Sequence, residues 1–275
     1  MIEINTIFAV IDPTTDKQFA LQRAMRIART SEAKIHAYLC ISPTMETHDL
    51  EALERVERAR YEPWLEKIVE EARAQGFDID TELDWSDDWR TALGSAAIRA
   101  KSDFIVKASR VHSATERLFM TSSDISLIQT ANCSVQLVSS EVIDDLYKVL
   151  ISVDTKREDE EYQAILDSVI GYGKTVAATN EKGEVHAVYA YSGSENFEHV
   201  TKIAKRLDID TDNVHVHGGS PEVAIAEVSK EVGAQIIIIG FSTKSSLRNR
   251  IFGNIVDKLL NSIEHDILVV IPPEK

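Results

Sequence analysis

Residues 236–254 read IIIIGFSTKSSLRNRIFGN, a stretch that is typical of one fold class. Four consecutive isoleucines predict a strand that is buried on both faces, as in a parallel sheet covered by helices. Gly240 permits a tight exit from that strand. A serine-rich, basic loop follows, and Gly253-Asn254 opens a segment that is typical of a helix. The order strand, loop, helix is half of a βαβ unit.

The chain contains matching apolar strands in two series. A strand that ends in an aspartate occurs near the start, TIFAVID at 6–12, and again near the middle, KVLISVD at 148–154. Four matched strands in one order predict a duplication, with one domain over residues 1–143 and a second over residues 144–275. The other three pairs are KIHAYL from Lys34 with EVHAVY from Glu184, SDFIVK from Ser102 with AQIIIIG from Ala234, and CSVQLV from Cys133 with DILVVI from Asp266.

Segments of helical periodicity separate these strands. In the segment that begins at Pro221, we expect Val223, Ile225 and Val228 to face the core and Ser220 to cap the helix. Apolar strands that alternate with amphipathic helices are typical of parallel sheets covered on both faces. We therefore predict an α/β protein of two tandem doubly wound domains, each with a five-stranded parallel sheet.

The composition limits the partners that this chain can have. Asp and Glu number 45 against 30 for Lys and Arg, and the formal net charge is −15. A chain this acidic repels nucleic acid and anionic membranes. Apolar runs stay below the ~20 residues that span a bilayer, and acidic residues stand where a signal peptide would be basic. We expect a cytoplasmic protein with neither nucleic acid nor membrane as partner.

The ends of the predicted strands form the candidate ligand site. In open parallel sheets, ligands bind beyond the carboxyl ends of the strands, where the strand order reverses. The loop after Gly240 leads to a helix N-terminus, where free N–H groups and the helix dipole favour an anion. From the residues alone, a phosphate-binding loop and a simple turn remain equal alternatives. Donors and positive charges in this loop are Ser242, Thr243, Lys244, Ser245, Arg248, Arg250 and Asn254.

The duplication, the order of elements and this loop resemble the universal stress protein family, in particular its tandem two-domain E type. The nucleotide-binding loop of the family reads Gly-x2-Gly-x9-Gly-(Ser/Thr), and this chain reads Gly240-x2-Thr243-x9-Gly253-Asn254. The resemblance implies an adenine nucleotide alpha hydrolase-like fold and a stress-response function. It also implies that the second domain binds ATP or another adenine nucleotide, through Asp154, Gly240, Thr243, Gly253, Asn254 and Ile255.

Two departures from the family pattern change what we expect. Thr243 replaces a glycine, and a β-branched residue either strains a positive φ or narrows the pocket, so the nucleotide affinity should be weakened. In the first domain the same spacing reads Lys107-x2-Arg110-x9-Met120-Thr121, without any glycine. Long side chains replace the open backbone that a nucleotide needs, and we predict that the first domain does not bind ATP.

Other reactive side chains lack the arrangement of a catalytic or metal site. His215 and His217 share one face of a strand, but a zinc site needs three or four ligands. Hydrogen-bonded structural histidines are the preferred interpretation, with a surface zinc ion as the alternative. Cys40 and Cys133 form no disulfide framework and have no base nearby in sequence, which favours structural thiols. We expect no catalytic residues and at most weak ATP hydrolysis, for which Asp154 is the evident base.

Three functions therefore remain open. The first is a regulatory, ligand-binding stress-response protein, and the second is a binding module for a non-nucleotide ligand such as a lipid or a nucleotide-sugar. The third is a nucleotide hydrolase. In the family the fifth strand often pairs with its counterpart, so the resemblance implies an intramolecular pseudo-dimer, with a homodimer as a further possibility.

Overall fold

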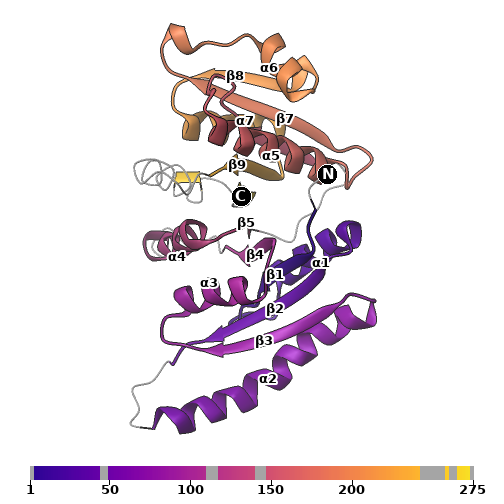
Figure 1. The fold of residues 1–275 in the computed structure, drawn as a ribbon, viewed down its shortest axis with the longest axis vertical. Coiled ribbons are helices and arrows are strands. Elements are labelled where there is room, and N and C mark those ends of the chain that lie inside the picture. Colours follow the sequence, from indigo (N-terminus) through magenta and orange to yellow (C-terminus); the bar gives the residue numbers. More distant parts are fainter. Residues whose placement is uncertain are drawn as a thin grey trace. The chain divides into compact units, whose positions relative to one another are not determined.

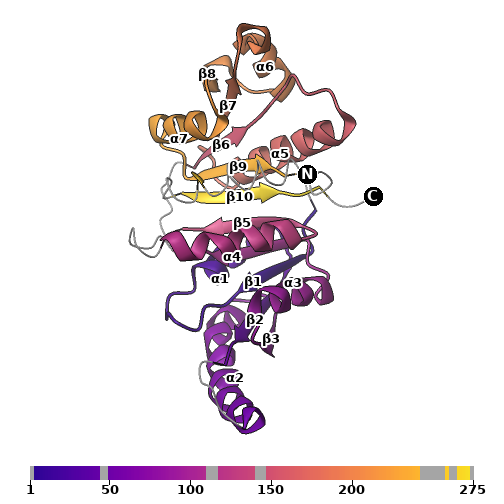
Figure 2. The same cartoon turned by 90° about the vertical axis from the view of Figure 1, so that its left-hand side faces the viewer.

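A computed structural model describes residues 3–43, 49–109, 117–139, 147–241, 258–259 and 265–272. Contacts divide the chain into two compact units (Figures 1 and 2). The N-terminal unit comprises Glu3–Ser109 and Thr130–Val138, and the C-terminal unit comprises mainly Ser139–Lys275 together with Arg110–Gln129. The domain boundary at residue 143 stays a prediction.

The N-terminal unit is built around five parallel strands in the order β3-β2-β1-β4-β5. Helix α1 packs on β1 and β4, α2 packs mainly on β3, and α3 packs on β2. Helices α1 and α3 cover opposite faces of this sheet (Figure 1). The bounds are β1 Thr6–Val10, α1 Phe19–Ser31, β2 Lys34–Ile41, α2 Leu50–Ala74, β3 Ile79–Trp85, α3 Trp89–Arg99, β4 Phe104–Ala108 and β5 Ser134–Val138. Helix α4, Arg117–Thr130, connects β4 and β5 in the sequence, but contacts group all of it except Thr130 with the C-terminal unit.

The C-terminal unit repeats this plan with parallel strands in the order β10-β9-β6-β7-β8. Helix α5 packs on β6 and β9, α6 on β8, and α7 on β7; α5 and α7 lie on opposite faces (Figure 1). The predicted fold class is confirmed in both units. The bounds are β6 Lys148–Ser152, α5 Glu160–Ala177, β7 Glu184–Tyr191, η1 Ser194–Asn196, α6 Val200–Leu207, η2 Thr211–Asn213, β8 Val214–Gly218, α7 Pro221–Val232, β9 Ile236–Gly240 and β10 Asp266–Val270.

The central strands are buried along their length, as their uninterrupted apolar sequences predict. Ile7, Phe8 and Ala9 of β1 are fully buried, and so are Ile237 and Ile238 of β9. Because helices cover both faces of the sheet, the side chains on both faces of a central strand are buried, and its sequence does not alternate between apolar and polar residues. Within the described helices, none has the length and apolar character needed to cross a membrane.

Strand pairing corrects the register in which the two halves were matched. Ile7 pairs with Phe104 in the N-terminal unit, and Val149, at the equivalent place in β6, pairs with Ile236. Ala108 is therefore the equivalent of Gly240, and Lys107 is the equivalent of Ile239. Matching by sequence placed Lys107 opposite Gly240, which is wrong by one residue. Apolar runs without alternation carry no register signal, so the hydrogen-bond ladder decides it.

The last strand of each half is shifted in the same way. Phe104 pairs with Ser134 and Ile236 pairs with Asp266, so the equivalent of Asp266 is Ser134 rather than Cys133. The hydrogen-bond ladder again decides the register.

Helix α7 begins at Pro221 as predicted, but one of its expected core residues faces outward. Ile225 and Val228 are buried together with Ala224, whereas Val223 is exposed. Residues 223 and 225 are separated by about 200° around a helix, so they cannot share one buried face. Ser220 occupies the N-cap position, yet its side chain makes no capping hydrogen bond to the backbone.

Candidate functional site

The strand order of the C-terminal unit reverses between β6 and β9. Strands β7 and β8 follow β6 on one side, whereas β9 and β10 lie on its other side. Strands β6 and β9 are paired from Val149 opposite Ile236 to Ile151 opposite Ile238. Beyond the last pair, their carboxyl ends line a cavity of about 200 Å³. Its walls are Ser152, Arg157, Tyr162, Ile165, Leu166, Val169, Pro221, Ile225, Ile239 and Gly240.

The glycine at the end of β9 is required by helix packing. A β-carbon added to Gly240 would lie 2.2 Å from Ile165 Cγ2 and 3.3 Å from Val169 Cγ2, both on α5. The first distance is far inside van der Waals contact, so α5 can approach the strand only because no side chain is present. Gly240 therefore shapes the cavity by letting α5 form one of its walls.

Asp154 lies in the loop that follows β6, two residues after Ser152, and its backbone is bonded to Tyr162; both of these residues belong to the cavity wall. Its backbone N–H donates to the Tyr162 hydroxyl at 2.7 Å, and its Oδ1 accepts the backbone N–H of Lys156 at 3.2 Å. Among the described residues, no partner is found for its second oxygen, Oδ2. This half-buried carboxylate is thus fixed in position and keeps an acceptor for a ligand.

Arg157 and Tyr162 form the polar part of the wall. The Arg157 guanidinium lies 4.1 Å from the centre of the Tyr162 ring and pairs with Asp159, with an Nη2–Oδ2 distance of 2.9 Å. Burial, followed by the charge of Asp154, raises the pKa of Tyr162 above its ordinary value, so the phenol stays protonated. The wall therefore presents a flat cation stacked on an aromatic ring.

The loop after β7 holds the Asp154 loop in place. Glu198, which is buried, accepts a hydrogen bond from Thr155 Oγ1 at 3.0 Å and pairs with Lys202 at 2.6 Å. Burial opposes the charge of Glu198, but its contacts with Lys202 and Thr155 outweigh burial and lower its pKa. Lys156 Nζ also donates to the Glu195 carbonyl at 2.5 Å. These links tie the loop of Asp154 to the neighbouring strand end.

The equivalent place in the N-terminal unit is built differently. There β1 and β4 remain paired one residue further, up to Val10 opposite Lys107. Lys107 is buried, donates to the Ala108 carbonyl at 3.2 Å and lies 6.0 Å from the Trp89 ring centre. A buried cationic side chain thus takes the position that Ile239 holds in the cavity wall.

A glutamine closes the loop after β1. Gln18 Oε1 accepts the backbone N–H of Asp12 at 2.9 Å, and its Nε2 donates to the carbonyls of Asp12 and Thr15. Tyr162 performs the first of these roles in the C-terminal unit. The prediction that the first domain does not bind ATP concerns Arg110 and the Met120 side chain as well, and both lie outside the described residues.

Of the six residues predicted to bind nucleotide, two are described. Asp154 follows the carboxyl end of β6 and Gly240 is the last residue of β9. The switch point lies between these two strands. Thr243, Gly253, Asn254 and Ile255 lie outside the described residues. Sequence reasoning missed Tyr162, Arg157 and Glu198, for which the only signal was that Arg157 and Tyr162 follow Asp154 closely.

The histidines are hydrogen-bonded, as predicted. His215 Nε2 lies 3.2 Å from His186 Nδ1, and His217 Nε2 lies 2.8 Å from a carboxylate oxygen of Glu227. Within the described ranges, no group of three or more His, Cys, Asp and Glu side chains is placed to hold a metal ion.

Cys133 is expected to resist alkylation in the folded protein. Burial, with the nearby charge of Asp103, raises its pKa from 9.0 to about 12, which lowers the thiolate fraction about a thousandfold at pH 8. Burial also raises the pKa of Cys40, but that side chain is only half-buried. Mass spectrometry after iodoacetamide treatment should find Cys40 labelled first, and equal labelling only after denaturation. Native Cys133 reacting as fast as Cys40 would contradict this assignment.

Comparison with known proteins identifies one family over most of the chain. A model of the universal stress protein family matches residues 3–139 and 152–270. A universal stress protein E homolog from Haemophilus influenzae is 22% identical over 307 residues, which cover 100% of this chain and 99% of the relative. Universal stress protein E of Photorhabdus laumondii is also 22% identical, over 99% of this chain and 96% of its own length.

Solved structures agree on the fold. A Pseudomonas aeruginosa protein of unknown function superposes with a TM-score of 0.79 at 20% identity, over 98% of this chain and 93% of its own. A universal stress protein from Archaeoglobus fulgidus gives a TM-score of 0.75 at 16% identity, over 99% of this chain and 98% of its own. At these identities the likeness establishes the α/β architecture.

Proposed function

The chain belongs to the universal stress protein family, a stress-response class, and from this premise we propose that it is a cytoplasmic regulatory protein whose C-terminal unit binds an adenine nucleotide. Its similarity to tandem relatives named universal stress protein E extends over the whole chain, as the duplicated pattern indicated. Ligand binding, rather than a committed reaction, is the activity that we propose.

The observation that carries the proposal is the opening between β6 and β9. Pairing stops at Ile151 and Ile238, and the strand ends beyond them line a cavity at the switch point. In the N-terminal unit the equivalent strands stay paired and Lys107 fills the place. Ligands of doubly wound sheets bind where the strand order reverses, which supports the C-terminal unit as the binding unit.

The size and chemistry of the cavity fit one part of a nucleotide. About 200 Å³ is below the ~300–1,000 Å³ typical of complete ligand sites, so we assign it to the base or the ribose. Aliphatic walls from Ile165, Ile225 and Ile239 suit a flat ring, and Asp154 Oδ2 can accept a hydrogen bond from its edge. The phosphates would then extend toward the loop that follows β9.

A second candidate ligand is an apolar one. All but three of the residues around the cavity are glycine, proline or aliphatic, the exceptions being Ser152, Arg157 and Tyr162. A short acyl chain would bury against the same aliphatic walls, with Arg157 near an anionic head. This lining favours a lipid as the alternative to a free nucleotide.

Thermal and chemical unfolding in the presence of ATP, ADP and AMP tests the nucleotide proposal. A ligand at a hundred times its Kd stabilises the protein by about 2.7 kcal/mol. The substitution Asp154→Asn keeps Oδ1 for the Lys156 N–H but changes Oδ2 from an acceptor to a donor, and we expect it to abolish most of the shift. The matched control is Asp12→Asn, at the equivalent position of the N-terminal unit, which should leave the shift unchanged.

Each outcome of this experiment decides between the candidates. Loss of the shift in Asp154→Asn alone supports a nucleotide site in the C-terminal unit. An equal loss in Asp12→Asn, or no shift with any of the three nucleotides, contradicts it. In the latter case native mass spectrometry of the purified protein identifies the second candidate by the added mass of an acyl compound.

A further inference from the structure

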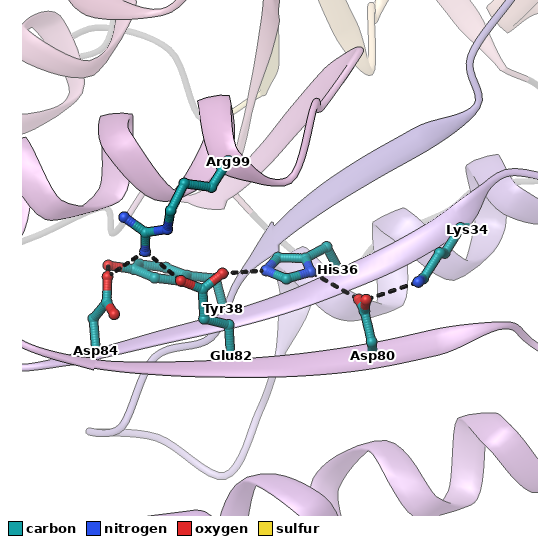
Figure 3. Close-up of polar contacts among 7 residues, drawn as sticks. All are labelled: Lys34, His36, Tyr38, Asp80, Glu82, Asp84 and Arg99. Carbon is teal, nitrogen blue, oxygen red and sulfur yellow. Dashed lines mark hydrogen bonds and ion pairs between the residues drawn. The ribbon is translucent and has the colours of Figure 1, made fainter.

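The two units carry equivalent polar clusters between their outer strands, with opposite charges. In the N-terminal unit, His36 Nδ1 lies 2.7 Å from Asp80 and its Nε2 lies 2.8 Å from Glu82 (Figure 3). Arg99, at the end of α3, pairs with both Glu82 and Asp84. The cluster therefore combines carboxylates of the edge strand β3 with a guanidinium from the covering helix.

Strand register identifies the counterparts in the C-terminal unit. Tyr38 pairs with Glu82, and Val188, the equivalent of Tyr38, pairs with His215. His215 therefore replaces Glu82, and the same register makes His217 the counterpart of Asp84. The turns that follow α3 and α7 give the third match. The Ser102 N–H donates to the Ala97 carbonyl after α3, and the Ala234 N–H donates to the Ser229 carbonyl after α7. Two residues beyond these carbonyls, Glu231 takes the place of Arg99.

The central histidine is common to both clusters, but its partners differ. His36 faces two carboxylates, whereas the equivalent His186 has its Nδ1 3.2 Å from Nε2 of His215, with the rings stacked 5.5 Å apart. His186 Nε2 lies 3.4 Å from Glu184. Only one proton fits between the two facing nitrogens of an imidazole pair. The pair can therefore bind one further proton and keep this hydrogen bond, but when both rings are protonated the facing nitrogens are both donors and the hydrogen bond is lost.

We propose that strand β8 with helix α7 forms an acid-sensitive edge of the C-terminal unit. When both His186 and His215 are protonated, their hydrogen bond is lost and β8 separates from β7 more often. The equivalent edge of the N-terminal unit keeps its links, because His36 lies between the carboxylates of Asp80 and Glu82 and Arg99 bridges Glu82 and Asp84. The two units thus respond differently to acidification.

The charged groups around the pair support this assignment. His186 Nε2 faces Glu184 at 3.4 Å, and Glu184 is itself 3.8 Å from Lys148 of β6. Burial lowers the pKa of His215, the charge of His186 lowers it further, and Glu231 of α7 opposes them. Several other charges on elements that contact β8 have separate partners: Glu227 with His217, Lys202 with Glu198, Arg206 with Asp167 and Glu222 with Lys258. Lys205 of α6 and Lys230 of α7 add two positive charges to these elements.

The direction of the pH effect follows from linkage. The pKa of His215 is lower in the folded state than its ordinary value of 6.5, so the unfolded or opened state binds more protons. Stability from this group is complete above pH 6.5 and is lost as the pH falls from there through the lower folded pKa. One pH unit below 6.5, the opening equilibrium can increase by up to about tenfold.

Hydrogen exchange with mass spectrometry on the full chain tests the proposal. Protection factors, corrected for intrinsic exchange rates, are compared at pH 7.5 and pH 5.5 for peptides that cover residues 214–218 and 79–85. We expect protection of β8 to fall several-fold, up to about tenfold, while that of β3 stays level or rises. Unchanged protection of β8, or an equal fall in β3, would overturn the proposal.

Variants separate the His186–His215 pair from the other histidines. His215→Gln removes the titrating ring and should make the protection of β8 independent of pH in this range. His215→Glu installs the carboxylate found at Glu82 and should reverse the direction of the effect. His217→Gln is the matched control and should keep the wild-type fall. If His215→Gln does not fold, His186→Gln gives the same test, and a fall that persists in either folded variant refutes the mechanism.

Discussion

Replacing Phe8 with alanine is expected to lower the free energy of unfolding of the N-terminal unit by about 4 kcal/mol. Phe8 is fully buried on the central strand β1. Its ring lies 5.4 Å from that of His36 and 5.0 Å from that of Tyr38, centre to centre. The truncation removes apolar contact area and leaves a cavity beside the rings of His36 and Tyr38, which the rigid strands cannot fill by relaxation.

Tryptophan fluorescence during urea unfolding measures this effect selectively. The chain has three tryptophans, Trp64, Trp85 and Trp89, and all of them lie in the N-terminal unit. The control is Phe8→Leu, which keeps most of the volume and should cost less than about 1.5 kcal/mol. A loss of under 1 kcal/mol in Phe8→Ala would show that Phe8 does not anchor this core.

The substitution Gly240→Val is expected to destabilise the C-terminal unit by about 3 kcal/mol, the upper end of typical overpacking. The new β-carbon alone would lie 2.2 Å from Ile165 Cγ2, and valine adds two methyl groups beside it. Helix α5 must move away from β9, which also distorts the cavity that both elements line. Unfolding followed by far-UV circular dichroism should therefore show an earlier transition, while the tryptophan signal of the N-terminal unit is unchanged.

A double-mutant cycle tests the stated cause. Ile165→Ala removes the clashing methyl group, so combining it with Gly240→Val should recover about 1–3 kcal/mol relative to the sum of the single changes. Gly94→Ala is the matched glycine control, because its nearest neighbour would be Thr130 Oγ1 at an ordinary 3.8 Å. That change lies inside α3 and should be neutral or stabilising. Strict additivity of the first pair would exclude the clash as the cause.

Much of the architecture could be predicted because it depends on local pattern. Uninterrupted short apolar runs such as 236–239 are typical of buried strands, and their alternation with amphipathic segments indicates covered parallel sheets. The aspartate at position 154 could be placed at a strand end for the same reason. Periodicity failed at Val223, where two residues of one helix were assigned to a face too narrow for both.

The site was less predictable, because its walls come from segments far apart in sequence. Tyr162 and Ile225 meet at one cavity only because α5 and α7 both reach the strand ends. The role of Gly240 could not be read from the motif, since a phosphate-binding glycine and a helix-packing glycine look identical in sequence. Its cause is the distance to Ile165, which only the folded chain defines.

By itself, the sequence determined the duplication, the strand and helix types and the family, because burial and periodicity are properties of short segments. The tertiary structure decided the pairing register and everything that depends on it. The register makes Ala108, and not Lys107, the counterpart of Gly240. It also brings Glu82 close to His36 in the N-terminal unit and His215 close to His186 in the C-terminal unit. Hydrogen bonds between strands fix these encounters, and no pattern within a single strand records them.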